Sequence, residues 1–399
     1  MYQPSQEILK KYADVLIKFA LWSWKGIKKW DVIYLTISES AKPFLLPLQQ
    51  SILEAWWHMI LKYLPEWVNR SFLEKASQEQ IEYWPKEHML SLIDVTTHIV
   101  FIDSTWNKYE LKWIDGQKII ARQSAAKFYM DARNKKENEW KMTRTIWLYW
   151  TEQMASEVWM TLEEYWQEII KACFLDEEDP IAKWQEVFAQ MEEIRSKISN
   201  LPIDKIHVFW DDADLWITLW EKRKWLAGSG RNIPSFEVFT SPDWRWTNGW
   251  IRFNQPLYRY WNLIEWIELE FKDGVIIRSS ATKWEELLKE MLSAPNADKI
   301  WEFSLTDRRF SRITKFMWET LYDENVGWEF GNTHIAVWMS FQETFTWDIP
   351  AQSEEDWVRM WFNNSSIHTD IMSTTNRTVV VTLNNWEELL IYKDWEFKI

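Results

Sequence analysis

Glycine is scarce and tryptophan abundant in this 399-residue chain, which contains 8 glycines and 34 tryptophans. At an ordinary background of about 7%, a globular protein of this length has about 28 glycines. Glycine matters because it is the residue that adopts positive φ angles at little cost, in tight turns and at helix ends. A chain so poor in glycine is restricted in the turns and close backbone approaches that it can form without strain.

Several tryptophans stand where turn chemistry is expected, namely Trp30 in IKKWDVIYL, Trp328 in ENVGWEF, Trp386 in LNNWEELL and Trp395 in YKDWEF. Asp-Gly and Asn-Gly are the usual turn dipeptides at such places. A non-glycine residue in the left-handed region costs about 1–2 kcal/mol. A dozen such sites would consume most of a typical folding free energy of about 5–15 kcal/mol. We therefore hypothesise that the gene reads the codon UGA as glycine, and that these positions are glycines translated as tryptophan.

Other tryptophans have the sequence surroundings of authentic aromatic positions: Trp84, Trp166, Trp184, Trp216 and Trp225. Two alternatives stand beside the recoding hypothesis. The glycines were deliberately replaced, or the tryptophans form a genuine aromatic surface that stacks on sugars or lies at a membrane interface. The codons decide between these explanations, because UGG at the turn positions excludes recoding.

Composition excludes several classes of protein. The net charge of −14 argues against general nucleic-acid binding, which needs clustered Lys and Arg. No apolar run reaches 18 residues, so we expect no membrane-spanning helix. The N-terminus has the pattern of an amphipathic helix rather than of a signal peptide. A single cysteine, Cys173, suits a reducing compartment, and we expect a cytoplasmic protein in which Cys173 is a buried packing residue.

The first half of the chain alternates helical and strand patterns. The apolar spacing predicts a helix over 5–24, a buried strand over 31–37, a long helix over 42–63 and a strand over 97–103. This order predicts an α/β domain with a parallel sheet. Further helices are predicted over 119–134, 161–174 and 181–198.

After about residue 205 the pattern changes to short strands and turns, with helices predicted over 283–292 and 308–322 and a closing meander over 378–399. This texture predicts an α+β domain. We therefore place an N-terminal α/β domain at 1–200 and a C-terminal domain at 201–399, which we expect to be catalytic.

Five side chains of the C-terminal half are candidate metal ligands. In an extended segment, His368 and Asp370 project from the same face, which places an imidazole beside a carboxylate. His334, Glu237 and Glu302 lie in similar settings, where polar turns meet apolar segments. Taken singly, a lone histidine is more often a core residue, a His-x-Asp pair is more often a surface pair, and an isolated glutamate is more often solvated. Their coincidence within one domain favours a metal site.

The ordered segments GRNIPSFEVFTSPDWR, KIWEFSLTD, GNTHIAVW and SSIHTDIM resemble the thermophilic-type metalloaminopeptidases, the aminopeptidase T and aminopeptidase S family. The resemblance covers nearly the whole chain. It implies a cytoplasmic homodimer that removes N-terminal residues from peptides with a free N-terminus. It also implies two divalent metal ions, and Zn, Co or Mn each suit nitrogen and oxygen ligands. The implied metal ligands are Glu237, Glu302, His334, His368 and Asp370, with Glu237 and Glu302 also in catalytic roles.

The chain departs from the family pattern in two ways. Phe341 stands where the family often has a metal-binding tyrosine, and its ring offers no oxygen, so one coordination position passes to water or stays open. Trp301, directly before Glu302, stands where the family pattern has glycine, as does Trp361. Two alternatives to an active peptidase follow: a protein of this fold that has lost activity, and a carbohydrate-binding protein that uses surface tryptophans.

Overall fold

The computed structural model describes residues 2–21, 25–56, 58–104, 107, 110–111, 113–219, 222–228, 230, 232–259, 262–327, 329–337, 340–347, 349, 352–362 and 369–399. The chain divides into two compact units. Unit 1 comprises Met1–Ala182 with Ser229–Ile233, and unit 2 comprises Lys183–Gly228 with Pro234–Ile399. Within the described ranges, no helix is long and apolar enough to cross a membrane. The boundary predicted near residue 200 stays a prediction.

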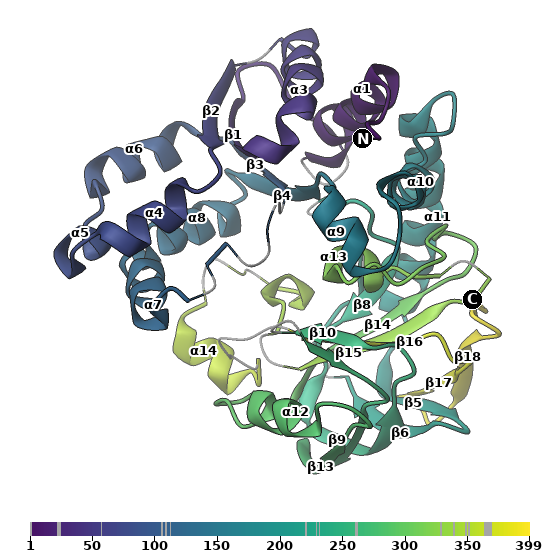
Figure 1. Ribbon diagram of the computed structural model, residues 1–399. Coiled ribbons are helices and arrows are strands. Elements are labelled where there is room, and N and C mark those ends of the chain that lie inside the picture. The colour runs from purple at the N-terminus through teal and green to yellow at the C-terminus, as the bar shows by residue number, and fades with distance from the viewer. Residues whose placement is uncertain are drawn as a thin grey trace. The chain divides into compact units, whose positions relative to one another are not determined.

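Unit 1 is built on a four-stranded parallel sheet in the order β2-β1-β3-β4 (Figure 1). The strands are β1 (Val32–Ser38), β2 (His58–Leu64), β3 (His98–Asp103) and β4 (Thr143–Leu148). Five consecutive residues in the middle of β1 are buried, as expected for a strand inside a parallel sheet. This sheet confirms the α/β prediction for the first part of the chain.

The helical elements of unit 1 begin with α1 (Gln6–Asp14), which runs into a π-helix, η1 (Val15–Ala20). Ser5 caps α1 with its hydroxyl, and Leu9, Tyr12 and Ala13 form its buried stripe. The other elements are η2 (Glu39–Ala41), α3 (Lys42–Glu54), α4 (Val68–Lys75), α5 (Gln78–Glu82), α6 (Lys86–Val95), α7 (Gly116–Ala125), α8 (Lys127–Asn138), α9 (Glu152–Glu157) and α10 (Leu162–Ala172).

Two predictions for unit 1 were wrong. The helix expected over 42–63 ends at Glu54, and 58–64 forms strand β2 instead, because this short apolar run pairs along its whole length with β1. The helix expected over 119–134 is two helices, α7 and α8, which meet at Ala126. Strand β4 was not predicted.

Unit 2 contains two main sheets, in which every strand pair is antiparallel. The larger sheet has the order β13-β12-β9-β6-β5-β17-β18-β19, and the smaller has the order β16-β15-β14-β8-β7. The strands are β5 (Ile203–Trp210), β6 (Ala213–Thr218), β7 (Leu226–Ala227), β8 (Glu237–Thr240), β9 (Asp243–Arg252), β12 (Glu268–Lys272), β13 (Val275–Ser280), β14 (Ile300–Thr306), β15 (Asn332–Val337), β16 (Thr369–Ser373), β17 (Thr378–Leu383), β18 (Glu388–Lys393) and β19 (Glu396–Phe397).

The remaining elements of unit 2 are short apart from one helix. They are α11 (Pro180–Ser199), the hairpin of β10 (Leu257–Arg259) and β11 (Asn262–Ile264), α12 (Glu285–Leu292), α13 (Thr320–Asp323), η3 (Gln342–Thr344) and α14 (Glu354–Arg359). Strands and short helices together confirm the α+β prediction. Strands β17, β18 and β19 form the predicted closing meander.

The helix predicted over 308–322 was wrong, since only Thr320–Asp323 is helical. Side chains provide hydrogen-bond acceptors for the backbone there. The carboxylate of Asp307 accepts from the backbone N–H of Arg309 at 2.9 Å. That of Asp323 accepts from the N–H of Met317 at 2.6 Å. Such local bonds compete with helix formation.

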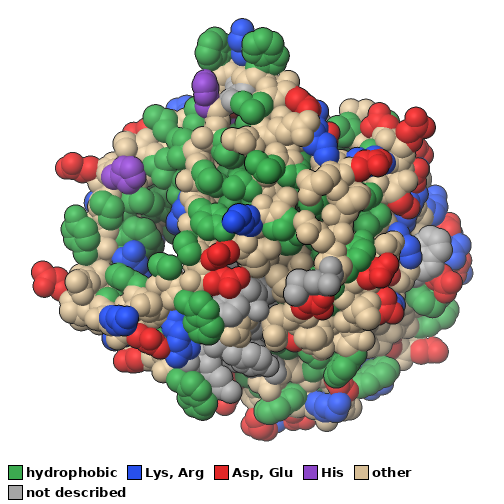
Figure 2. All heavy atoms as spheres, turned by 45° about the horizontal axis from the view of Figure 1, so that its top comes forward, with side chains coloured by type: hydrophobic (Ala, Val, Ile, Leu, Met, Phe, Trp, Pro, Cys, Tyr) green, Lys and Arg blue, Asp and Glu red, His purple; other side chains and the backbone are tan. Residues whose placement is uncertain are grey.

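The molecular surface mixes charged and apolar side chains. Figure 2 shows one face, on which hydrophobic side chains lie among acidic and basic ones. Exposed tryptophans are numerous, and the side chains of Trp30, Trp56, Trp113, Trp159 and Trp386 are each more than 75% exposed. These indoles gain little from burial, so their presence needs an explanation other than core packing.

Candidate metal centre

The strand register of the smaller sheet in unit 2 brings four of the predicted ligands onto one face. Ser304 of β14 aligns with His334 of β15, and Thr306 aligns with Glu237 of β8. Glu302 shares the face of Ser304, because side chains two apart on a strand point the same way. In β16, Asp370 aligns with Ala336, two residues from His334. A β-bulge between Ile300 and Glu302 precedes the acidic residue of β14.

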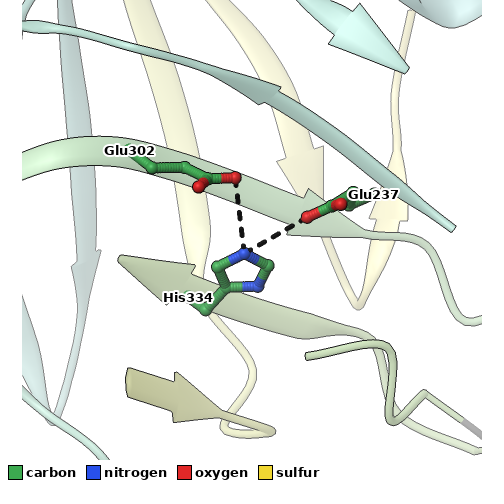
Figure 3. Close-up of side chains that lie close together, drawn as sticks. All are labelled: Glu237, Glu302 and His334. Atoms are coloured by element: carbon green, nitrogen blue, oxygen red, sulfur yellow. Dashed lines mark ion pairs between the residues drawn. The ribbon is translucent and has the colours of Figure 1, made fainter. Parts of the chain in front are cut away.

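Glu237, Glu302 and His334 converge at the centre of this face (Figure 3). His334 Nε2 lies 3.4 Å from Glu237 Oε2 and 3.7 Å from Glu302 Oε1. One ligand atom from each residue lies within 4.8 Å of the others. All three side chains are buried. Carboxylate oxygen and imidazole nitrogen at this spacing are the ligand set of Zn, Mn or Co.

Of the other two predicted ligands, Asp370 is buried on the same face. Its negative charge contributes to raising the pKa of Glu302. His368 lies outside the described residues. The structure thus brings Glu237, Glu302 and His334 together and places Asp370 beside them.

Burial and mutual repulsion alter the proton affinity of the cluster. Burial, with the nearby charges of Glu237 and Asp370, raises the pKa of Glu302 to about 7 against the opposing effect of His334. Burial alone would lower the pKa of His334. The two carboxylates that face its ring outweigh this effect and raise the pKa of His334 well above its usual range. The cluster therefore holds protons at neutral pH that a divalent cation must displace.

Glu324 is a further buried carboxyl of this cluster that sequence reasoning missed. Burial raises its pKa well above the usual range, and the charges of Glu237 and Asp370 add to the effect. Asn325 Nδ2 donates to Glu324 Oε1 at 3.4 Å, and Asn332 Nδ2 donates to the Glu324 carbonyl at 2.7 Å. Only its place ten residues before His334, in a polar segment, hinted at a role. Acidic residues in such segments are too common for that to identify a ligand.

The residues present fit a divalent cation. Four carboxyl groups and one imidazole are buried together, and buried charges require pairing or a metal. Ser235 Oγ and Ser304 Oγ each lie 3.4 Å from an oxygen of Glu237 and donate to it. His334 Nδ1, buried in the described part of the chain, has no hydrogen-bond partner there.

The position of the expected tyrosine lies among aromatic rings. The ring of Phe341 is 4.8 Å from that of Trp301 and 5.2 Å from that of Phe239. The backbone N–H of Phe341 donates to Ser241 Oγ at 2.9 Å. Trp301 is almost fully buried.

Several known aminopeptidases are similar to this chain in sequence. Aminopeptidase PepS of Streptococcus thermophilus is 23% identical over 397 residues, with 93% of each chain covered. Aminopeptidase 2 of Geobacillus stearothermophilus is 23% identical, with 91% of each chain covered. Aminopeptidase T of Thermus aquaticus is 29% identical, but the match spans only about half of each chain, 53%.

In a comparison of structures, the solved structure of wild-type AmpT from Thermus thermophilus matches with a TM-score of 0.81 at 20% identity. The match covers 99% of this chain and 100% of the other, so the fold is shared throughout. The model of the thermophilic metalloprotease family, M29, matches residues 5–397. The resemblance seen in the sequence motifs is thereby confirmed. The chain belongs to the thermophilic metalloprotease family M29.

Proposed function

We propose that this protein is an aminopeptidase that releases residues from peptides with a free N-terminus. The observation that carries the proposal is the buried cluster of Glu237, Glu302 and His334 in a chain that matches the metalloprotease family from residue 5 to 397. Relatives that match over more than nine-tenths of their length are named aminopeptidases.

The proposed centre holds two divalent ions, Zn, Co or Mn, through Glu237, Glu302, His334, His368 and Asp370. Glu324, which lies among the same charges, would add a further oxygen ligand. Bound metal supplies a water of lowered pKa and polarises the scissile carbonyl. The fit rests on hard carboxylate oxygens and imidazole nitrogen within one buried cluster.

The chain's own residues contribute proton transfer and charge. Glu302, a buried carboxyl group of the cluster, is suited to take a proton from water and to pass it to the departing amine. Glu237 is held in place by hydrogen bonds from Ser235 and Ser304. The surplus of buried carboxyl groups favours a substrate that brings a positive charge, as the free ammonium of an N-terminus does.

We place the catalytic domain at 201–399 and the accompanying α/β domain at 1–200, and we propose a cytoplasmic homodimer. The dimer and the location rest on the family resemblance. Light scattering of the purified protein tests the dimer, and a monomer at working concentration would exclude it.

The first prediction tests the site. Glu302→Gln keeps the size of the side chain but removes its charge and proton acceptor. We expect kcat for release of an N-terminal residue to fall at least about 100-fold, since general acid–base groups contribute about 10²–10⁴-fold. Glu286→Gln is the matched control, because that carboxylate is on the surface and paired with Lys289. Unchanged turnover in Glu302→Gln contradicts the site assignment.

A chelator and a blocked substrate complete this test. Chelation should abolish activity, and an N-acetylated peptide should not be cleaved. Sugar binding that a chelator does not affect, without peptide cleavage, would favour the carbohydrate-binding alternative. Full metal content without turnover would indicate a protein of this fold that has lost its activity.

A further inference from the structure

Tryptophan dominates the left-handed region of this backbone. Among the described residues, seventeen non-glycine residues have positive φ, and twelve of them are tryptophan, although tryptophan makes up less than a tenth of the chain. This region favours glycine and strains a residue with a bulky side chain. The twelve are Trp30, Trp56, Trp67, Trp113, Trp140, Trp159, Trp266, Trp284, Trp318, Trp361, Trp386 and Trp395.

The tryptophans that the sequence marks as authentic lie outside this group. None of the five positions that the sequence marks as authentic has positive φ: Trp84, Trp166, Trp184, Trp216 and Trp225. Trp166, Trp184 and Trp225 are buried in the core, and Arg122 lies over the ring of Trp84 at 3.8 Å. Of the tryptophans expected in turns, Trp30, Trp386 and Trp395 have positive φ, while Trp328 lies outside the described residues.

Three of the twelve tryptophans end helices in the position where glycine is most favoured. Trp140, Trp159 and Trp361 each come directly after the C-cap residue of a helix, and each completes a Schellman motif. In this motif the next residue donates its N–H to a carbonyl five residues back. The three bonds are Lys141 N to Lys136 O, Met160 N to Ala155 O and Phe362 N to Trp357 O.

Two hairpins of unit 2 provide an internal comparison. Strands β12 and β13 are joined by Asp273–Gly274, with φ of 50° and 82°. Strands β18 and β19 are joined by Asp394–Trp395, with φ of 55° and 59°. Positive φ at both central residues is the type I′ turn, for which Asp-Gly is a preferred sequence. The second hairpin has the same backbone and the same first residue, with tryptophan in place of glycine.

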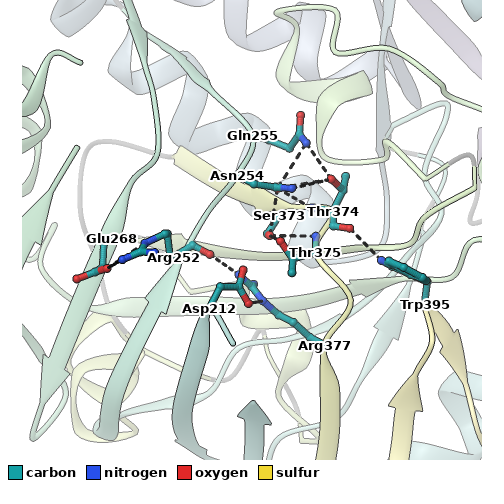
Figure 4. A network of polar contacts seen from close by, with 10 residues as sticks. All are labelled: Asp212, Arg252, Asn254, Gln255, Glu268, Ser373, Thr374, Thr375, Arg377 and Trp395. Atoms are coloured by element: carbon teal, nitrogen blue, oxygen red, sulfur yellow. Dashed lines mark hydrogen bonds and ion pairs between the residues drawn. The ribbon is translucent and has the colours of Figure 1, made fainter. Parts of the chain in front are cut away.

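Burial does not compensate for the strain at most of these positions. The side chains of ten of the twelve are more than a third exposed, from 37% at Trp361 to 87% at Trp113. Phe174 shows the contrast, because it also has positive φ after a helix end but is 1% exposed. Trp395 is more enclosed, and its indole donates to the Thr374 carbonyl at 2.9 Å (Figure 4).

We propose that the protein made in its own cell has glycine at these twelve positions, each encoded by UGA. The printed sequence then has tryptophan at these positions because UGA was translated as tryptophan. The inference concerns the identity of the residues and is independent of the catalytic proposal. A deliberate replacement of glycines, or a genuine tryptophan surface, requires UGG at the same positions.

Peptide mass mapping of the protein purified from the organism that carries the gene tests the proposal directly. Peptides that contain these positions should show the mass of glycine, and the corresponding codons should be UGA. Peptides that contain Trp166, Trp184 and Trp225 should show tryptophan. Tryptophan masses or UGG codons at the twelve positions would overturn the inference, whatever the behaviour of any variant.

A second experiment uses recombinant protein from a host with the standard code. A variant with all twelve positions changed to glycine should unfold at least about 10 °C above the chain as printed, since strain is removed at each site. The control changes Trp84, Trp166, Trp184, Trp216 and Trp225 to glycine, and its Tm should fall. An equal or lower Tm for the twelve-site variant would count against the proposal.

Discussion

At the scale of single residues, charge and burial define the site. Glu302, His334 and Glu324 each hold a proton more strongly than an exposed group of the same type, and their charges act on one another. A divalent ion must displace those protons before it can bind, because metal ligands are deprotonated. Proton and metal therefore compete for the same buried atoms.

The competition gives a pH prediction. Because the pKa of Glu302 is raised to about 7, its carboxyl carries a proton below that pH and is ionised above it. We expect apparent Zn affinity to fall about tenfold for each pH unit below 7 per proton displaced, and to rise toward a plateau at higher pH. Titration of metal-free protein between pH 5.5 and 8 measures this. In Glu302→Gln the slope should lessen, and an unchanged slope would show that other groups carry the protons.

At the scale of elements, the chain turns where helices end. Two helix ends in unit 1 differ in whether burial of a side chain offsets the backbone strain. Trp140 after α8 and Phe174 after α10 have nearly the same φ, 56° and 55°. The indole of Trp140 is 64% exposed, whereas the ring of Phe174 is buried. Left-handed strain of about 1–2 kcal/mol acts at both sites, but only the second also has burial to offset it.

We expect the two glycine substitutions to change stability in opposite directions. Trp140→Gly should raise the free energy of unfolding by about 1 kcal/mol, because strain is relieved and little burial is lost. Phe174→Gly should lower it by about 2 kcal/mol, since the loss of a buried phenylalanine costs about 3–5 kcal/mol. Urea unfolding of the two variants provides the comparison. Destabilisation by Trp140→Gly would show that its indole contributes to packing.

At the scale of the whole molecule, the sequence predicted the order of helices and strands better than the residues at which each begins and ends. The strand patterns over 31–37 and 97–103 predicted the parallel sheet, and β1 and β3 form there, with β1 buried over five consecutive residues. The helix expected over 308–322 failed because carboxylates of Asp307 and Asp323 bind backbone N–H groups. Those bonds are local alternatives to helical hydrogen bonds, and the apolar spacing that predicted the helix does not record them.

The site shows the same limit. Glu237, Glu302 and His334 were identified because they lie in ordered sequence motifs and are residue types that bind metal ions. Glu324 was missed because its part in the cluster comes from burial, and burial depends on how the segment after α13 folds beside β15. The order of the candidate ligands along the chain can be predicted from the sequence, whereas the charge balance around them can be derived only from the structure.

The cluster also couples metal binding to the stability of the fold. Its buried carboxyl groups repel one another, so a cation that binds the folded chain and not the unfolded one stabilises it. At a free metal concentration of about 100 times Kd, the gain is about 2.7 kcal/mol. We therefore expect Zn to raise Tm, and a chelator to reverse the rise. Because the ligands belong to unit 2, Glu302→Gln should diminish the rise while a surface change such as Glu286→Gln leaves it intact. A rise of equal size in Glu302→Gln would place the stabilising metal elsewhere in the molecule.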